Sequence, residues 1–315
     1  MSDNPTNKID VSIDSYIRNR TLQSDSHLIN GIPDYAYGPD FFLREKLKAI
    51  PGVYKIFKAL LSYYGPIQKK RLNMSCVKVG PSQYPEIYEM GKECARILGI
   101  GIPEIYIDGD VSMLNAYTYA TDDTYPIIVL YSEIVRRFTP EELMTVIGHE
   151  CGHIHNNHTI YNTAAEILFK GALTMLPSYI RTIISIPFYM SLKAWSRAAE
   201  VTSDRAGIIC SKNPEDILTA DIKLLSAGDL GYGDINVEAV LKQYETIRNS
   251  PVRFEEYLYD HPIIVRRLFA EKEFLNSEIL YKWRPEWKNE SIPLIDKQEL
   301  DSRCEKYIAV RKKGQ

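Results

Sequence analysis

The chain has 315 residues, of which 45% are hydrophobic and 25% are charged, and its formal net charge is −3. This composition is typical of a globular protein with a large buried core, and the length allows one elaborated domain or two small ones. Runs of Lys and Arg are short, so we expect no nucleic-acid partner. The five cysteines are an odd number without CxxC spacing, which argues against a disulfide framework and a cysteine zinc site.

The N-terminal part of the chain is polar at its start and lacks the apolar core of a signal peptide, so we expect a cytoplasmic protein. Residues 1–33 are rich in Asp, Ser and Asn, and we expect them to be loosely ordered. Residues 34–74 should form a helical extension, broken at Pro51-Gly52 and Gly65-Pro66. Its apolar and basic positions are compatible with a reversible membrane contact, but we expect the extension to pack against the rest of the protein.

The next segments combine short strands with a well-marked helix start. Residues 103–107 and 126–131 are β-branched or aromatic and are bounded by Gly, Asp and Pro, which predicts two neighbouring strands. Thr139-Pro140-Glu141-Glu142 has the pattern of a capping box with proline at the first helical position. A helix therefore begins near Pro140, and its apolar positions predict that it is buried: Leu143, Met144, Val146, Ile147 and Ile154.

That helix carries the sequence His149-Glu150-Cys151-Gly152-His153, an HExxH motif. Residues i and i+4 share one face of a helix, so both imidazoles can reach the same metal ion. Zinc lowers the pKa of a bound water to about 7, and the neighbouring carboxylate of Glu150 can take its proton during attack on a peptide carbonyl. The motif is therefore typical of a metallopeptidase.

A third metal ligand must come from elsewhere. The longer motif HExxHxxGxxH needs Gly at position 156 and His at position 159, where this chain has Asn156 and Thr159. If the helix continued, His158 would point to another side of it, so we expect His155 and His158 to be solvated polar residues.

The remaining candidates are two glutamates further along, Glu166 and Glu200. Residues 196–207 read as a helix in which Asp204 lies one turn beyond Glu200, where it could accept the second ring N–H of a metal-bound histidine. Glu166 has no such companion, so Glu200 is the predicted ligand.

The apolar stretch of residues 164–195 separates the motif from this ligand. Its longest uncharged run, Thr182–Leu192, has 11 residues, whereas a membrane-spanning helix needs about 20. We expect a pair of apolar helices that flank the cleft, as part of the core or as a lid. Further helices are predicted near Asn213, over 237–248 and over 262–274.

These motifs together resemble a known family. HExxH followed by ExxxDRxG is similar to the gluzincin peptidases that include the HtpX heat-shock proteases and the CAAX prenyl endopeptidases. The resemblance extends from about Tyr84 to about Leu268 and rests on three further matches: Leu114–Tyr117 with the NAF/NAY segment, Thr139–His153 with the motif helix, and His261-Pro262 with Arg267 as the late HPxxxxR element.

The resemblance implies a zincin-like α+β fold, predominantly helical, with residues 75–276 as the peptidase domain and 277–315 as a tail. It implies one zinc ion per chain, bound by His149, His153 and Glu200, with Glu150 as the general base. The expected roles of the other residues are as follows: Asn115, Ala116 and Tyr117 form a substrate-binding edge strand, Asp204 orients a ligand, and Arg267 pairs with an acidic residue.

Two of these assignments leave alternatives open. Asn115 could be an ordinary turn residue. His261 could donate to the developing oxyanion or approach the metal, or it could only cap the helix that follows.

Two functions follow from the motifs. The first is a zinc endopeptidase that cleaves extended or unfolded polypeptides, with a role in protein quality control. The alternative is a zinc-stabilised peptide-binding or chaperone-like protein that does not cleave. An intact Glu150 favours the enzyme, because a binding protein needs no general base. The sequence does not determine the oligomeric state.

Overall fold

The fold is described here from a computed structural model for residues 27–49, 53–119, 126–161, 178–226, 236–246, 263–288 and 293–309. Helices dominate these residues: α2 (Gly38–Lys48), α3 (Val53–Ser75), α4 (Pro85–Leu98), α5 (Ser132–Arg137), α6 (Pro140–His155), α8 (Ser178–Cys210), α9 (Asp216–Leu225), α10 (Val237–Glu245), α11 (Ile264–Leu275), α12 (Glu278–Trp283) and α13 (Lys297–Ile308). With the small sheet described next, the fold is α+β and mostly helical, as predicted.

The main sheet has four strands in the order β3-β4-β6-β5: β3 (Cys76–Lys78), β4 (Glu104–Asp108), β6 (Ile127–Tyr131) and β5 (Ala116–Tyr119). The central pair, β4 and β6, is parallel, and the outer strands are antiparallel to their neighbours. The predicted strands at 103–107 and 126–131 correspond to β4 and β6. A separate hairpin joins β1 (Leu28–Ile29) to β2 (Ile32–Pro33).

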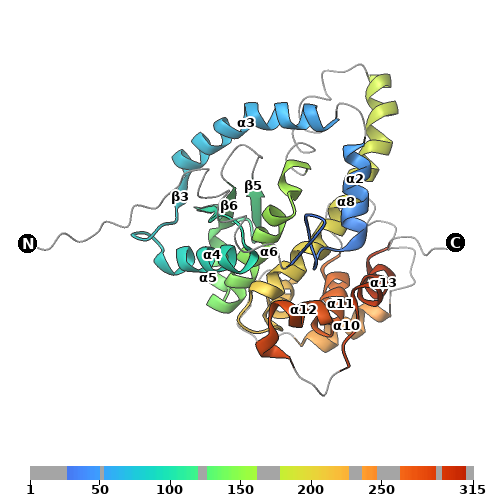
Figure 1. The fold of residues 1–315 in the computed structure, drawn as a ribbon. Helices are drawn as coiled ribbons and strands as arrows, with labels where there is room; N and C mark the ends of the chain where they lie inside the picture. Colours follow the sequence, from blue (N-terminus) through green and yellow to red (C-terminus); the bar gives the residue numbers. More distant parts are fainter. Residues whose placement is uncertain are drawn as a thin grey trace, which may run out of the picture.

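Helices α6 and α8 pack against each other at the centre of the molecule (Figure 1). The sheet, α4 and α5 lie on one side of this pair in the view, and α10 to α13 lie on the other. One core cluster of buried apolar side chains runs from the sheet through both central helices to α13. The central pair is therefore supported from both sides.

The start of α6 has the local structure that its sequence predicts. Thr139 Oγ1 accepts a hydrogen bond from the Glu142 backbone N–H at 3.3 Å, and Glu142 Oε2 accepts one from the Thr139 N–H at 2.8 Å. Two N–H groups that the helix leaves without intrahelical acceptors are thereby satisfied. Lys223 of α9 also contacts Glu142 Oε2 at 2.8 Å. The start of α6 is thus fixed both locally and by a neighbouring helix.

Close packing of α6 on α8 depends on glycine. A Cβ atom on Gly148 would lie 2.5 Å from Cys210 Cβ, and one on Gly152 would lie 2.6 Å from Ala206 Cβ. On the other helix, a Cβ on Gly207 would lie 3.1 Å from the Thr145 carbonyl oxygen. Any side chain at these positions would push the two helices apart. The glycines therefore allow the motif helix and the helix of Glu200 to approach closely.

Two predicted features differ in the structure. The predicted break at Gly65-Pro66 is wrong, because α3 continues through Pro66; proline removes one helical N–H, and a long helix can tolerate that loss at a local cost. Instead of a separate helix over 196–207, α8 is a single helix that starts at Ser178. The other part of the predicted pair of apolar helices, residues 162–177, lies outside the described residues.

Residues near both ends of the described part of the chain also contribute to the core. Tyr35 and Tyr37, just before α2, are fully or almost fully buried, and so are Leu300 and Cys304 of α13.

Among the helices that the structure describes, none combines the length and the hydropathy needed to cross a bilayer.

Candidate metal centre

Three side chains predicted as metal ligands meet between α6 and α8. His149 Nε2 and His153 Nε2 lie 3.2 Å apart, and each lies 3.5 Å from an oxygen of the Glu200 carboxylate. Two histidines one turn apart on α6 therefore face one glutamate of α8. His153 and Glu200 are buried, whereas the His149 side chain keeps 13% of its surface exposed.

These separations match those required by a bound metal ion. A tetrahedral ion with bonds of about 2.0–2.1 Å holds neighbouring ligand atoms roughly 3.3 Å apart. The observed values of 3.2 and 3.5 Å lie close to this. Two neutral imidazoles and one carboxylate are also a ligand set found in catalytic metal sites that keep one position open. The three residues present thus fit a metal ion.

Asp204 supports the first ligand from behind. Its Oδ1 lies 2.9 Å from His149 Nδ1, the ring nitrogen that faces away from the ligand cluster. Burial opposes a charged imidazole, but the hydrogen bond to Asp204 and the charges of Asp204 and Glu200 outweigh it and raise the pKa of metal-free His149 to about 9. Because Nδ1–H donates to Asp204, Nε2 is left to face the metal position.

Arg267 of α11 compensates the buried negative charge of Asp204. Its Nε donates to Asp204 Oδ2 at 2.9 Å, and its Nη1 lies 3.7 Å from Glu200 Oε2. Burial opposes ionisation of Asp204, but the charge of Arg267 and the hydrogen bond from His149 keep the pKa of this aspartate below its ordinary value. An acidic partner for Arg267 was expected, and here that partner is the aspartate that holds His149.

A second group of acidic ligand atoms lies behind the first, made of Asp204, Asp221 and Glu271. The Arg267 guanidinium already supplies positive charge there, since it contacts both Asp204 and Asp221. Burial, together with the neighbouring acidic groups, raises the pKa of Glu271 well above its ordinary value, which favours the neutral form of this carboxyl. The Arg267 guanidinium therefore offsets part of the negative charge of this group.

The second ligand has a partner that the sequence reasoning missed. His158 Nδ1 lies 3.1 Å from His153 Nδ1, and His158 Nε2 lies 2.9 Å from Asp40 Oδ2. The prediction that His158 is solvated is wrong, because its side chain is fully buried. Helix α6 ends at His155, and Asn157 has a positive φ of 56°, so the helical spacing used for the prediction no longer applies at His158.

His155 was also predicted to be solvated, and it is buried too. Its Nδ1 lies 2.9 Å from the Tyr35 hydroxyl, which also accepts a hydrogen bond from Asn156 Nδ2 at 3.0 Å. The Arg44 guanidinium of α2 donates to the Asn156 carbonyl oxygen. Residues 35–44 therefore hold the C-terminal end of the motif helix. The polar residues at this end were predicted to be solvated because their partners lie far away in the sequence.

The strand β5 lies at the edge of the sheet and packs beside α6. The Asn115 carbonyl accepts from Tyr131 N–H of β6 at 3.1 Å, so by antiparallel alternation Tyr117 also faces β6 while Ala116 and Thr118 direct their backbone groups outward. Asn115 Oδ1 accepts from the Ala116 N–H at 2.9 Å. Asn115 thus orders the start of an edge strand.

Glu150 and His261 are the two remaining predicted site residues. Glu150 lies on α6 directly after His149 and is 6% exposed, so it belongs to the same buried helix segment. His261 lies outside the described residues, and its role stays a prediction.

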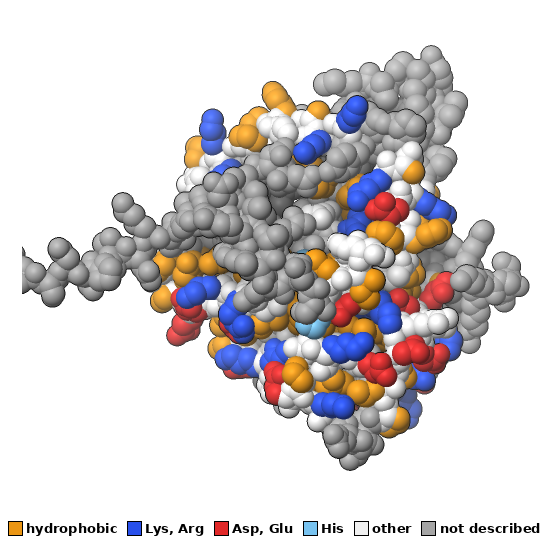
Figure 2. All heavy atoms as spheres, in the orientation of Figure 1, with side chains coloured by type: hydrophobic (Ala, Val, Ile, Leu, Met, Phe, Trp, Pro, Cys, Tyr) orange, Lys and Arg blue, Asp and Glu red, His pale blue; other side chains and the backbone are white. Residues whose placement is uncertain are grey.

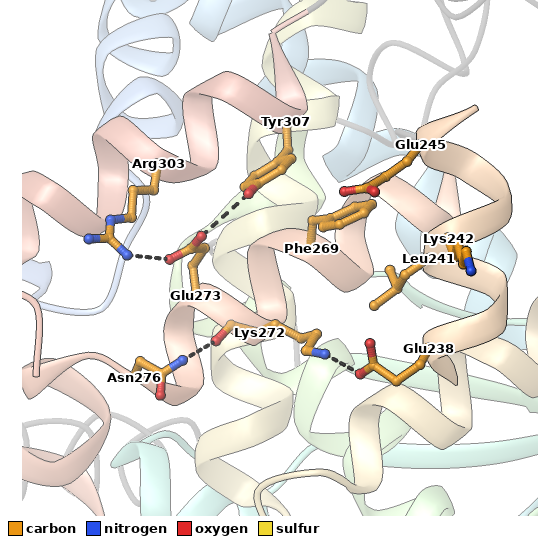
Figure 3. Close-up of a pocket in the computed structure, with 10 residues that line it drawn as sticks. All are labelled: Glu238, Leu241, Lys242, Glu245, Phe269, Lys272, Glu273, Asn276, Arg303 and Tyr307. Atoms are coloured by element: carbon orange, nitrogen blue, oxygen red, sulfur yellow. Dashed lines mark hydrogen bonds and ion pairs between the residues drawn. The ribbon is translucent and has the colours of Figure 1, made fainter. Parts of the chain in front are cut away.

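A hollow of about 540 Å³ lies away from these ligands, between α10, α11 and α13 (Figure 3). Two ion pairs lie in its lining: Lys272 with Glu238, and Arg303 with Glu273 at 3.2 Å. On the face drawn in Figure 2, Lys and Arg side chains of the described residues are interspersed with Asp and Glu. The grouped histidines and carboxylates, and not this hollow, carry the chemistry.

Comparison with known proteins agrees with this geometry. Residues 81–273 match the sequence model of peptidase family M48. A plastoglobule-localized metallopeptidase 48, chloroplastic, from Arabidopsis thaliana is 32% identical over 240 residues, which cover 73% of this chain and 69% of that protein. Protease HtpX homologs are more distant. The one from Moorella thermoacetica is 22% identical over 54% of this chain and 65% of its own length, and the one from Streptococcus thermophilus is 24% identical over 60% and 73%.

The family match spans strands β4, β5 and β6 of the sheet, both central helices and most of α11, and so includes all three converging ligand residues. The expected resemblance to HtpX-like peptidases is confirmed. The chain belongs to peptidase family M48 and is a metal-dependent endopeptidase.

Proposed function

We propose that the protein is a zinc endopeptidase in which His149, His153 and Glu200 bind one zinc ion. The observation that carries this proposal is the convergence of their ligand atoms at separations of 3.2–3.5 Å. Imidazole and carboxylate ligands in this number suit zinc, which accepts a tetrahedral set with one open position.

Glu150 acts as the general base in this proposal. Zinc, when bound, supplies Lewis-acid polarisation of the substrate carbonyl and of the attacking water. Glu150 takes the proton of the water that attacks the carbonyl carbon, and it delivers a proton to the amine nitrogen as the C–N bond breaks. The location of Glu150 directly after the first ligand on a capped, buried helix favours this role, because the helix fixes both side chains relative to each other.

The substrate is an extended polypeptide segment that pairs with β5. The outward N–H of Thr118 and the outward carbonyls of Ala116 and Thr118 offer backbone partners along the sheet edge. Such pairing reads the backbone and not the side chains, so unfolded proteins of varied sequence would be accepted. A role in protein quality control follows from this lack of side-chain selection; a cytoplasmic location stays a prediction from the composition of the N-terminus.

The test of the proposed function combines metal analysis with digestion of an unfolded protein by the purified full chain. We expect about one zinc per chain in the wild type and in Glu150→Gln, because glutamine keeps the size of the side chain and the ligands are untouched. Loss of the base should lower the cleavage rate by about 10²–10⁴-fold. Equal cleavage by both proteins, or cleavage that persists after zinc is removed, would contradict the proposal.

Edge-strand binding has its own test in Thr118→Pro. Proline removes the outward N–H and is tolerated at sheet edges, so KM for an unfolded substrate should rise while the zinc content and the melting temperature stay close to those of the wild type. An unchanged KM would contradict pairing at this edge without affecting the metal assignment.

A further inference from the structure

A chain of polar contacts leads from the metal centre to the N-terminal helix α2. It starts at His153, passes through His158 and ends at Asp40, with separations of 3.1 and 2.9 Å. His158 is fully buried and Asp40 is 1% exposed, so water does not compete for these hydrogen bonds. The two side chains come from parts of the sequence 118 residues apart.

The hydrogen-bond directions in this chain follow from the ligand role of His153. If Nε2 of His153 faces the metal, its proton lies on Nδ1, and His158 Nδ1 must accept it. The remaining proton of His158 then lies on Nε2, which donates to the Asp40 carboxylate. Asp40 can only accept, so it fixes His158 in this form, and His158 in turn fixes the ring of His153.

Asp40 is itself held in place by two further donors. Trp195 Nε1 donates to Oδ1 at 2.8 Å, and the Thr202 hydroxyl donates to Oδ2 at 2.7 Å. Both donors belong to α8, the helix that carries Glu200. Thr202 also accepts from the Tyr37 backbone N–H at 3.0 Å, which fastens the segment before α2 to the same helix.

The two histidine ligands thus have different supports. His149 contacts a carboxylate directly, through Asp204 of α8. His153 reaches its carboxylate through an additional imidazole, and that carboxylate lies in α2. The match to the family model begins at residue 81, so Asp40 lies outside the matched region.

We propose that Asp40 and His158 are positioning residues that orient the metal ligand His153, so that the affinity of the protein for zinc depends on helix α2. This inference rests on the proposed zinc site but not on proteolysis, since its tests measure metal binding and histidine hydrogen bonding. It assigns to the N-terminal segment a part in assembling the metal centre.

The first test measures zinc affinity by competition with a chromophoric chelator in the full chain. His158→Leu removes both hydrogen bonds, and we expect a loss of about 10–100-fold, as is usual for partners of metal-bound histidines. His158→Gln, which can both accept and donate, should recover part of that loss. Asp40→Asn should also weaken binding, because an amide N–H facing His158 favours the imidazole form that cannot accept from His153.

His155→Gln is the matched control. It alters a buried histidine at the end of the same helix, whose Nδ1 lies 2.9 Å from the Tyr35 hydroxyl. We expect its zinc affinity to stay within about threefold of the wild type, which is small beside the loss of about 10–100-fold expected for His158→Leu. Unchanged affinity in His158→Leu, or an equal loss in His155→Gln, would overturn the proposal, because the second result would show a general effect of packing.

The second test needs no variant and therefore does not depend on how well a mutant folds. In ¹⁵N-labelled, zinc-loaded protein, long-range ¹H–¹⁵N spectra report which ring nitrogen of each histidine carries a proton. We expect His153 protonated on Nδ1 and His158 protonated on Nε2 alone. A proton on His158 Nδ1 would overturn the proposal. Absence of bound zinc would instead refute the proposed metal site.

Discussion

Gly152 sets how closely α6 approaches α8, so Gly152→Ala perturbs the metal centre without altering a ligand. The new Cβ would lie 2.6 Å from Ala206 Cβ and 3.0 Å from Ser203 Cα. Carbon atoms in contact prefer about 3.5–4.0 Å, so the helices must separate by roughly 1 Å. That displacement is about five times the ±0.2 Å within which metal-ligand distances normally fall.

Two free-energy effects oppose each other in this variant. Overpacking a tight interface costs about 1–3 kcal/mol, while replacing a helical glycine by alanine stabilises by about 1 kcal/mol. The free energy of unfolding should therefore fall by no more than about 2 kcal/mol, and the protein should still fold. Zinc affinity should fall by at least about tenfold, or 1.4 kcal/mol, because Glu200 moves away from the histidines.

The assay is zinc affinity measured by chelator competition, with denaturant unfolding of the metal-free protein alongside. Gly91→Ala of α4 is the matched control, since its Cβ would lie 2.5 Å from Ile105 Cδ1, the end of a flexible side chain remote from the ligands. This control should keep its zinc affinity. Wild-type zinc affinity in Gly152→Ala would refute the reasoning that the glycine contact places Glu200.

Further predictions concern the ligands and their supports. Glu200→Ala should lower bound zinc well below one per chain by elemental analysis; retained zinc would point to another ligand. Arg267→Met should destabilise the protein by about 3–5 kcal/mol in denaturant unfolding, because Asp204 is left buried without its compensating charge; a cost below 1 kcal/mol would contradict the buried ion pair. At pH 7 the metal-free protein carries a proton on His149, whose pKa is about 9, so zinc binding should release about one proton there and almost none above pH 10. Zinc affinity should accordingly rise with pH up to about 9, and proton release that is absent at pH 7 in a weakly buffered indicator assay would contradict this.

Local sequence signals predicted the parts of the site that depend on local structure. The capping box at Thr139 and Glu142 needs only neighbouring residues, so the start of α6 could be read directly. The helical spacing of His149 and His153, and that of Glu200 and Asp204, likewise places each pair on one face. These two pairs face each other in the structure because glycines let their helices approach.

The parts that could not be predicted depend on contacts distant in sequence. Asp40 has no local signal as a partner of His158, since only the packing of α2 on α8 brings them together. Asn157 could have indicated that the helix ends before His158, because asparagine with positive φ is common just after helix ends. Pro66 illustrates the opposite error, since the local rule for proline predicted a break that α3 does not have.

The most direct test of the metal assignment is a crystal structure of the zinc-loaded protein with anomalous data collected at the zinc edge. We expect one strong peak within about 2.0–2.2 Å of His149 Nε2, His153 Nε2 and a Glu200 carboxylate oxygen. A peak among Asp204, Asp221 and Glu271, or a peak that lacks Glu200 as a ligand, would contradict it.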